Sequence, residues 1–532
     1  MQCKYLSSRL FQGADVIPII RFPKGPLLRN GSSFWMPPEP ASLPVAGSTE
    51  SFWLSEPSVI LSGHRTTELP PTEADVAIIG SGMAGAFIAQ SMFEDKRGRA
   101  LNVTMYEARE VCSGASGRNG GHCQPLLYIK PPDVAAFEAK NFDFIRALIE
   151  KNGIPCEWQA RPAVHAYYSE IELSQALQGL FNLQDVDPKL AEQCHLVTHQ
   201  SKSPSLEDLR VPKALAAVVL NKAASLWPYK LVAWILEQIL ARNPTAQGSG
   251  DRNGFFSLQT NTKVTHIWQL PDKRWALKTD RGMAVAKHVV LATNGYTSSI
   301  CPCMSDLIVP VRGEMSAIKP LAPLTSPLHR SYGFVGNTGK SDDGDYLIQR
   351  PNNGHLMYGG GRKLAPQSGI GFSDDSQIDE PAANYLRSEL PHIMSLGEEE
   401  DCKLQITHQW TGILGFSRDG APWVGEVPGK ENANLWICAG YTGHGMPQAA
   451  LSAYAVTKML LQTVFDGKPL AEVHSSLIEA GDLPESFIIS AERIARAREL
   501  PQISEQQHKT HVEKLSALVE EHFSTVEELR QV

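Results

Sequence analysis

Three glycines near residue 80 have a spacing that lets a chain hold a phosphate. Gly80, Gly82 and Gly85 form a GxGxxG pattern in GSGMAG, directly after the apolar run ADVAII and before the apolar segment AFIAQSMF. At such a strand-to-helix turn, the amide groups and the helix dipole can bind a pyrophosphate. The pattern alone is weak, because glycine-rich turns match it by chance, so its surroundings decide what it means.

A carboxylate follows where a dinucleotide needs one. Glu107 ends the strand-like segment LNVTMYE, 22 residues after Gly85, and an acid at this point accepts hydrogen bonds from an adenosine ribose. We therefore predict a βαβ unit that binds a dinucleotide, and favour it over a plain βαβ turn with a surface glutamate. The other candidate cofactor contacts in this unit are Ser81, Met83, Ala84 and Ala108.

A second glycine-rich stretch, CSGASGRNGGHCQP (residues 112–125), begins five residues past Glu107. A dinucleotide lying along the βαβ unit would extend its second half over this stretch. Ser116 and nearby amides would reach the pyrophosphate, and the bare backbone of Gly120 and Gly121 would contact a flat ring system. This arrangement fits a flavin better than a nicotinamide.

The length and composition are those of a folded protein with more than one domain. The chain has 532 residues, of which 42% are apolar and 20% charged, so it exceeds one compact core but has ordinary globular usage. With a formal net charge of -8 and no dense cluster of Lys and Arg, nucleic acid is not an expected partner. No apolar run predicts a membrane span and no signal-peptide pattern is found, so we expect an intracellular, cytoplasmic protein. The nine cysteines are dispersed, and Cys301 and Cys303 lack the spacing of a zinc or CxxC site, so no metal is expected.

Periodicity and turn residues predict an order of elements along the chain. Residues 1–70 have the composition of an irregular extension pinned to the surface by its aromatic residues. Residues 255–295 alternate as short strands, and residues 345–362 are typical of a hairpin. Helices are expected over residues 133–151, 228–240 and 446–461, and a strand over 435–440. Residues 512–529 carry one apolar helical face, which would pack on its own protein or, alternatively, form an oligomer seam.

Several separated motifs together resemble one family. GSGMAG, YEA, GASGRNGGH, ATNGYT, DGAPWVGE and AGYTGHGM occur in this order and are similar to motifs of the FAD-dependent oxidoreductases related to D-amino-acid oxidase, glycine oxidase and sarcosine oxidase. The GASGRNGG form is most similar to the gamma-glutamylputrescine oxidoreductase branch and its fungal relatives. The resemblance implies an α/β fold in which a Rossmann-type FAD-binding domain, assembled from residues 71–160, 210–315 and 400–470, carries an inserted mixed-sheet substrate domain. That substrate domain would comprise residues 161–209 and 316–399, followed by a helical C-terminal extension at 471–532.

The resemblance also implies where FAD would lie. His122 would sit beside the isoalloxazine ring, and Val264 would contact the adenine. A helix beginning at Met446 would direct its N-terminal dipole toward the anionic reduced flavin. The remaining expected contacts from these motifs are Ala115, Ser116, Asn119, Gly121, Asn294, Gly295, Gly443, His444 and Gly445.

Members of this family remove a hydride from the carbon next to an amine nitrogen, and oxygen usually reoxidises the flavin to give hydrogen peroxide. We therefore expect a small-molecule amine as substrate and oxygen as electron acceptor. Two alternatives stay open: a tailoring oxidase of secondary metabolism whose imine is captured in a cyclisation, and a flavin-binding subunit without turnover.

Three side chains are candidates for catalysis. His122 is favoured as an active-site group over a merely packed imidazole. Lys363, or Arg362, falls near the cation that activates oxygen in sarcosine oxidase; the alternative is a solvated charge at a strand end.

No cysteine stands at residues 411–412, the position of the cysteinyl link in sarcosine oxidase, and Arg118 lies near the position of the histidyl link. FAD is thus predicted to be bound without a covalent bond.

One position bears on the substrate. In glycine oxidase an arginine five residues before the Asp-Gly pair holds the substrate carboxylate, whereas here Leu414 precedes Asp419 by five residues. Leucine cannot replace a guanidinium that forks two hydrogen bonds onto a carboxylate. We therefore predict an amine with an apolar or distal polar body rather than a simple amino acid. The alternative is that Arg350 or Arg362 supplies the fork from another strand.

Overall fold

The computed structural model describes residues 39–242, 254–321, 324, 326–337, 344–352, 354–397 and 404–503. The strands are β1 (Glu73–Ile79), β2 (Val103–Tyr106), β3 (His122–Cys123), β4 (Gln159–Ala160), β5 (Ala163–Tyr167), β6 (Cys194–Thr198), β7 (Ala216–Leu220), β8 (Ala224–Ser225), β9 (Phe256–Gln259), β10 (Val264–Gln269), β11 (Trp275–Thr279), β12 (Gly282–Leu291), β13 (Ile308–Pro320), β14 (Ser331–Val335), β15 (Gly344–Gln349), β16 (Leu356–Gly360), β17 (Leu404–Ser417), β18 (Trp423–Glu426) and β19 (Leu435–Ala439). The α-helices are α1 (Met83–Glu94), α2 (Lys96–Arg99), α3 (Pro132–Asn152), α4 (Glu170–Val186), α5 (Pro188–Ala191), α6 (Pro228–Ala241), α7 (Thr297–Ile300), α8 (Glu380–Ser388), α9 (Leu390–Ile393), α10 (Ala449–Phe465), α11 (Leu470–Glu479) and α12 (Ala491–Glu499).

The predicted βαβ unit is present. β1 and β2 are parallel neighbours, with Val76 opposite Val103, and α1 forms the crossover that parallel strands require. Gly85 lets α1 approach the turn closely, because a Cβ atom there would lie 2.0 Å from the carbonyl oxygen of Gly80. This glycine thus serves helix packing, as the third glycine of such a turn does.

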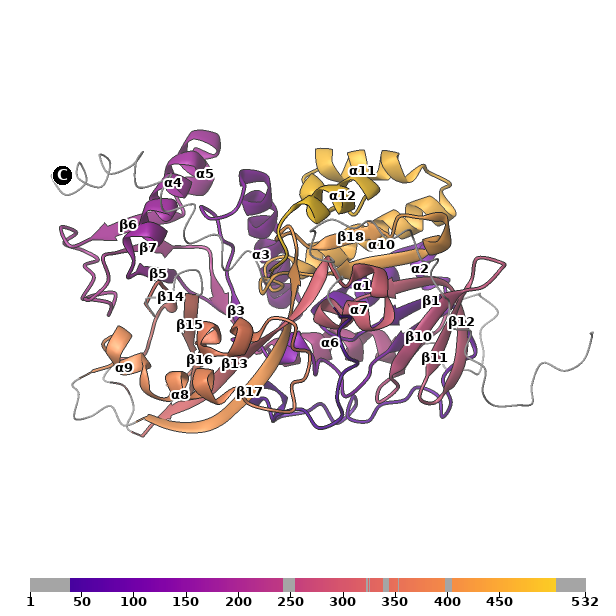
Figure 1. The fold of residues 1–532 in the computed structure, drawn as a ribbon, viewed down its shortest axis with the longest axis horizontal. Helices are drawn as coiled ribbons and strands as arrows, with labels where there is room; N and C mark the ends of the chain where they lie inside the picture. Colours follow the sequence, from indigo (N-terminus) through magenta and orange to yellow (C-terminus); the bar gives the residue numbers. More distant parts are fainter. Residues whose placement is uncertain are drawn as a thin grey trace, which may run out of the picture. The chain divides into compact units, whose positions relative to one another are not determined.

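The first sheet is a mostly parallel sheet with helices packed on it. Its strand order is β10-β11-β12-β1-β2-β9, and β19 pairs with both β12 and β18. The pairs β1/β12, β1/β2, β2/β9 and β12/β19 are parallel, while β10, β11 and β18 join in antiparallel fashion. α1 packs against both α6 and α10, and Figure 1 shows α1 and α10 alongside the strands β1 and β10 to β12. The predicted α/β class with a Rossmann-type domain is confirmed.

Alternation along β1 separates two hydrophobic cores. Val76 and Ile78 join the core formed with α1, α6 and α10. Ala77 and Ile79 point to the opposite face, where they pack with side chains of β10 to β12 and β19. Successive side chains of a strand point to opposite faces of a sheet, so a continuously apolar strand such as β1 is the type expected at the centre of a sheet covered on both faces.

The second sheet is mixed, and the short strands β3, β8 and β4 form a separate three-stranded sheet. The order of the second sheet is β17-β13-β16-β15-β14-β5-β7-β6, with β14 and β5 parallel and the other neighbours antiparallel. The hairpin predicted over residues 345–362 is confirmed as β15 and β16. Figure 1 shows α4 and α5 near β6 and β7, and α8 near β13 and β16.

Some strands lie in a different sheet from the one that their predicted segments imply. β7, β17 and residues 308–315 of β13 belong to the second sheet, although the resemblance places 210–315 and 400–470 in the FAD-binding domain. β17 pairs with β13 along its full length, from Ser417 opposite Ile308 to Leu404 opposite Pro320. Such a long-range pairing has no signature in local sequence, because both strands have the same alternation wherever they pair. The domain boundaries stay a prediction.

The ends of the chain differ partly from expectation. Within the extension, Phe52 and Trp53 are buried, as expected for aromatic residues that pin this segment to the rest of the protein, and Trp53 is only 1% exposed. α11 and α12 give residues 470–499 the expected helical character, while residues 512–529 lie outside the described part of the chain. α10 begins at Ala449, three residues after the predicted start at Met446. No helix within the described ranges has the length and apolar character needed to cross a membrane.

Candidate cofactor and substrate site

One cavity of about 1640 Å³ connects the two sheets, well above the range of about 300–1,000 Å³ typical of small-molecule pockets. The predicted site residues that line it are Gly80, Ser81, Gly82, Met83, Ala84, Glu107, Ala108, Ala115, Ser116, Asn119, Gly120, His122, Val264, Asn294, Gly295, Arg362, Gly443, His444, Gly445 and Met446. Gly85, Gly121 and Lys363 are not part of the lining. Most of the predicted site residues therefore lie on the wall of one cavity, although they come from segments that are far apart along the chain.

The turn between β1 and α1 is built for a close backbone approach. Gly80 has a φ of +105°, which disfavours residues with a side chain, and a Cβ atom at Gly80 would lie 2.6 Å from the carbonyl oxygen of Ala292. Gly82 is the residue before the first turn of α1, and its side-chain position faces Ser116 Oγ at 3.0 Å. That oxygen accepts a hydrogen bond from the amide of Met83 at 2.8 Å. The two glycine-rich stretches thus meet at the helix N-terminus, which is a favourable place for a phosphate.

The acid at the end of β2 is held in a fixed position. Glu107 Oε2 accepts hydrogen bonds from the amide and the hydroxyl of Ser81, at 3.0 and 2.6 Å. Its Oε1 accepts from the amide of Arg109 at 3.0 Å. Val264 lines the same cavity, as expected for the adenosine end.

The two glycines at residues 120 and 121 make room for protein side chains. A Cβ atom at Gly120 would lie 2.1 Å from the ring of Tyr346, and one at Gly121 would lie 2.7 Å from the ring of Trp53. Trp53 also donates its indole N–H to the carbonyl of Asn119. We predicted a cofactor contact for both glycines, but the structure gives Gly121 a packing role and leaves Gly120 in the lining.

A buried ion cluster supports this stretch, and both of its arginines, Arg109 and Arg118, also line the cavity. Arg109 pairs with Asp375 at 2.9 Å, and Arg118 lies 3.5 Å from the same carboxylate. Arg118 also donates to the carbonyls of Thr49 and Thr411, each at 2.8 Å. Buried charges are stable only when paired and hydrogen-bonded, so these contacts tie the N-terminal segment and β17 to the GASGRNGG stretch.

Three imidazoles line the cavity, and burial keeps them neutral. Burial lowers the pKa of His122 to about 3, with the nearby His165 and His444 adding to this effect. Burial likewise lowers the pKa of His165 to about 4 and that of His444 to about 3. His122 Nε2 lies 2.8 Å from the hydroxyl of Ser331. At neutral pH these side chains therefore act as polar, uncharged groups.

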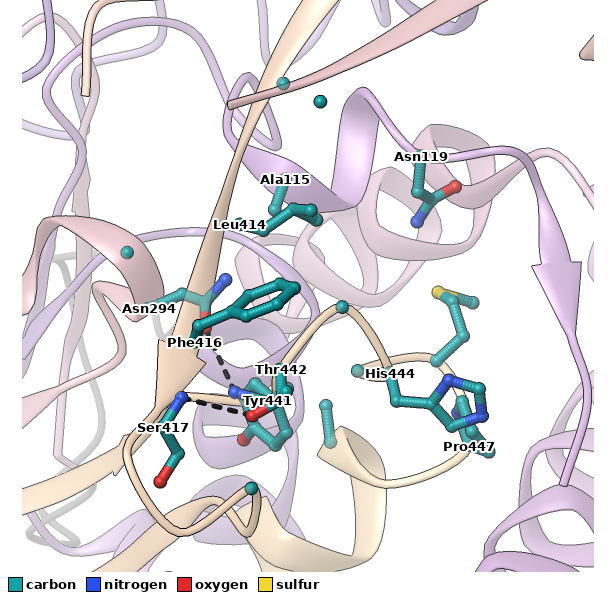
Figure 2. A pocket seen from close by; sticks show the side chains of 18 of the residues that line it. Ala115, Asn119, Asn294, Leu414, Phe416, Ser417, Tyr441, Thr442, His444 and Pro447 are labelled. Atoms are coloured by element: carbon teal, nitrogen blue, oxygen red, sulfur yellow. Dashed lines mark hydrogen bonds between the residues drawn. The ribbon is translucent and has the colours of Figure 1, made fainter. Parts of the chain in front are cut away.

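A tight turn between β19 and α10 closes another side of the cavity (Figure 2). The amide oxygen of Asn294 accepts from the backbone N–H of Gly440 at 3.1 Å and of Tyr441 at 3.4 Å. Thr442 accepts from the amide of Ser417 at 3.1 Å and has a φ of +51°. Such a conformation is rare for a residue with a branched side chain, so these bonds hold the turn in place.

The cavity wall at β17 is apolar. Leu414 and Phe416, two residues apart on this strand, both line the cavity and appear in Figure 2 with Ala115. The guanidinium of Arg362 lies over the ring of Phe416, 4.8 Å from its centroid. Arg350 is engaged elsewhere, with both oxygens of Glu157 at 2.7 and 2.9 Å. Of the two arginines that the sequence offered for the alternative fork, only Arg362 lines the cavity, and its Nη1 donates to the carbonyl of Ser368 at 3.4 Å.

Some residues of the site were not found from the sequence. Glu314 lines the cavity, and its burial raises the pKa of its carboxyl to about 8. Trp53 and Tyr346 shape the loop that carries His122. No local motif marks these positions, and only their burial next to the cavity distinguishes them.

The residues present fit an FAD molecule. The cavity contains, in order, a fixed carboxylate at Glu107, the glycine turn at the N-terminus of α1, and the segment with Gly120 and His122. These match the ribose, the pyrophosphate and the flat ring of a flavin dinucleotide. Among the described cysteines none lines the cavity, and groups of three or more metal-ligating side chains are absent from the described residues.

Comparison with known proteins agrees with this geometry. The family model described as "FAD dependent oxidoreductase" (DAO) matches residues 75–459. The chain is 24% identical over 405 residues to the glycine oxidase of Pseudomonas aeruginosa, covering 74% of this chain and 98% of that protein. It is 20% identical over 414 residues to the gamma-glutamylputrescine oxidoreductase of Escherichia coli, covering 73% and 83%.

The fold is shared with a solved structure. The glycine oxidase from Geobacillus kaustophilus superposes with a TM-score of 0.57 at 19% identity, over 76% of this chain and 98% of that one. The family match covers well over half of the chain, and the resemblance inferred from the motifs is confirmed. The protein is a member of the DAO family of FAD-dependent oxidoreductases.

Proposed function

We propose that the protein oxidises the C–N bond of a small-molecule amine that carries no carboxylate next to the reacting carbon. The C–H bond beside the nitrogen breaks, its hydride passes to FAD, and the nitrogen loses a proton as the C=N bond of an imine forms. Oxygen, with two protons, then takes up the two electrons as hydrogen peroxide. Bound FAD supplies the two-electron acceptor chemistry, and the protein supplies the cavity around it.

The observation that carries this proposal is the wall formed by β17. Leu414 lines the cavity, its place five residues before Asp419 is the one that the resemblance assigns to the carboxylate-binding arginine of glycine oxidase, and Arg350 is already paired with Glu157. A free amino acid would then bury its carboxylate without a guanidinium, which is unfavourable. The aromatic and apolar side chains also disfavour an ammonium, and hydride abstraction requires the neutral amine.

Matched pairs of compounds test the proposal. Purified protein containing FAD is mixed without oxygen with methylamine or glycine, dimethylamine or sarcosine, and ethylamine or D-alanine, together with longer amines, and bleaching of the flavin bands is followed. We expect amines to be oxidised with higher kcat/KM than their carboxylated counterparts. If an amino acid exceeds every amine, the inference from Leu414 is wrong, and Arg362→Gln should then raise the KM of that amino acid.

Product analysis separates the remaining alternatives. An aldehyde and ammonia would show hydrolysis of the imine, whereas a cyclic product would indicate a tailoring oxidase. A protein that binds FAD but is never bleached would support the subunit without turnover. Oxygen as acceptor and an intracellular location stay predictions, to be checked by peroxide detection and by imaging of the tagged protein.

A further inference from the structure

An unpaired carboxylate, that of Glu172 in α4, faces the cavity. Glu172 lies in the first turn of α4 and lines the cavity. The residue is only 6% exposed, and within the described part of the chain neither of its carboxylate oxygens has a hydrogen-bond partner. A buried carboxylate is costly to keep unless a cation or hydrogen-bond donor pairs with it. Glu172 is therefore suited to contact a ligand.

Helix capping does not occupy this carboxylate. Ser169 precedes α4, and Ser169-x-x-Glu172 has the sequence of a capping box, in which the glutamate accepts from the backbone N–H of the first residue. In the structure Ser169 makes no side-chain capping bond, and Glu172 is unpaired. The sequence motif thus leaves the carboxylate available.

The polar groups next to Glu172 satisfy one another. The hydroxyl of Tyr128 lies 2.7 Å from Nδ1 of His165 and 2.6 Å from the hydroxyl of Tyr167. Gln124 reaches the other ring nitrogen of His165 at 2.6 Å. Burial raises the pKa of Tyr167, and the Glu172 carboxylate adds to this effect, so the two side chains are close enough to interact. This network gives the wall a fixed polar surface but no positive charge.

The lysines that line the cavity act elsewhere. Burial raises the pKa of the Glu138 carboxyl to about 7, which the charge of Lys130 partly counteracts, and burial together with the same charge lowers the pKa of His444 to about 3. Lys263 donates to the carbonyl of Pro44 at 3.0 Å, at the end of the cavity that holds Val264. No ion pair to Glu172 is found among the described residues. The cation that Glu172 lacks would then come from the ligand.

We propose that Glu172 binds a distal ammonium group of the substrate, so that the preferred substrate is an α,ω-diamine or a longer amine with a second positive charge. One amino group is oxidised beside the flavin, as in the function proposed above on which this inference rests, and the other pairs with Glu172. A monoamine of equal length leaves the carboxylate unpaired. Leu414 and Glu172 thus act together, because the first disfavours a substrate carboxylate and the second favours an added cation.

The test compares α,ω-diamines of three to eight carbons with n-alkylamines of the same lengths. Binding is measured by anaerobic calorimetry and turnover by bleaching of the flavin. At the best length we expect the wild type to prefer the diamine by at least about tenfold in Kd and kcat/KM, as for a hydrogen bond to a charged group. Glu172→Gln should remove this preference, and Glu172→Asp should retain part of it.

Glu170→Gln is the matched control, because Glu170 is exposed in the same turn of α4 and the change removes the same charge. The inference is overturned if the wild type shows no diamine preference at any length, or if Glu170→Gln abolishes it as fully as Glu172→Gln does. If diamines bind in a Glu172-dependent way but bleach no flavin, the proposed oxidation fails and the binding site stands.

Discussion

At the scale of single residues, the site depends on positions where a side chain is absent. Gly82 lies at the mouth of α1, where Ser116 Oγ already occupies the nearest space. The phosphate-binding amides of a helix N-terminus must remain open to the ligand. The chemistry of the cavity also depends on the charged groups in its wall. Of the two cations predicted for catalysis, Arg362 is the one that lines the cavity.

Gly82→Val should release FAD, because the added methyl groups would occupy the pyrophosphate position beside Ser116. The ratio of flavin to protein absorbance after purification measures this loss. Gly47→Val is the control, since nothing lies within 4 Å of a Cβ atom at Gly47. Full FAD content in Gly82→Val would contradict the assignment of this turn.

Arg362→Gln should slow reoxidation of the reduced flavin by oxygen more than it slows reduction by substrate. Arg362 lines the cavity, and a fixed cation near developing negative charge lowers the barrier, so the rate should fall by about tenfold or more. Stopped-flow mixing of reduced enzyme with oxygen gives this rate. Lys363→Gln is the control, because Lys363 is not part of the lining; equal effects of both changes would argue against a special role for Arg362.

At the scale of elements, a segment without regular strands holds the cofactor loop. Residues 48–53 contact the GASGRNGG stretch through Ser51, whose hydroxyl donates to the carbonyl of Gly117 at 2.6 Å. Trp53 packs edge-on against Trp227, the residue directly before α6, with 5.7 Å between the ring centroids. The extension is thus a structural part of the site.

Trp53→Ala should destabilise the protein by about 3–5 kcal/mol, the usual cost of removing a large buried aromatic side chain. It should also weaken FAD binding, since Gly121 packs on the lost ring. Chemical denaturation and titration of the apoprotein with FAD measure the two effects. Trp53→Phe should recover most of the stability; if FAD affinity is unchanged in Trp53→Ala, the segment supports the fold but not the site.

At the scale of the whole molecule, the cavity is lined by buried titratable groups whose pKa values are shifted in opposite directions. His165 is kept neutral, with a pKa lowered to about 4, while burial raises the pKa of Glu314 to about 8. Each departs from its value in the unfolded chain, so each makes the free energy of unfolding depend on pH.

His165→Gln and Glu314→Gln should therefore change this pH dependence in opposite directions. The unfolded chain protonates His165 near pH 6.5 and the native protein only near pH 4, so the wild type loses stability as pH falls between these values, by up to about 1.4 kcal/mol per pH unit. The native protein keeps Glu314 protonated up to about pH 8, so stability falls as pH rises from 4.5 to 8. Denaturation at several pH values, with FAD in excess, measures both slopes. The difference in the free energy of unfolding between wild type and variant should shrink toward acid pH for His165→Gln and toward pH 8 for Glu314→Gln. If the free energies of wild type and variant instead run parallel across the pH range, the shifted pKa of that residue is contradicted.

The sequence determined the local elements and the cofactor. The βαβ unit, α3, α6, the β15/β16 hairpin and β19 all follow from patterns contained within a few tens of residues, because strand and helix periodicities and glycine turns are local properties. Glu107 and the glycines around it gave the dinucleotide site for the same reason. The start of α10 was misplaced by three residues because Pro447 suits a first helical turn but here lies in the turn before it.

Only the tertiary structure decided what surrounds the cofactor position. Trp53 meets Gly121, and Leu414 joins the same cavity as Ala115, across separations that no local pattern records. The neutral state of His165 and the unpaired state of Glu172 depend on burial by other segments. Burial and pairing of a polar group are properties of the packed chain, whereas the tendency of a segment to form a helix or strand is already present in its residues.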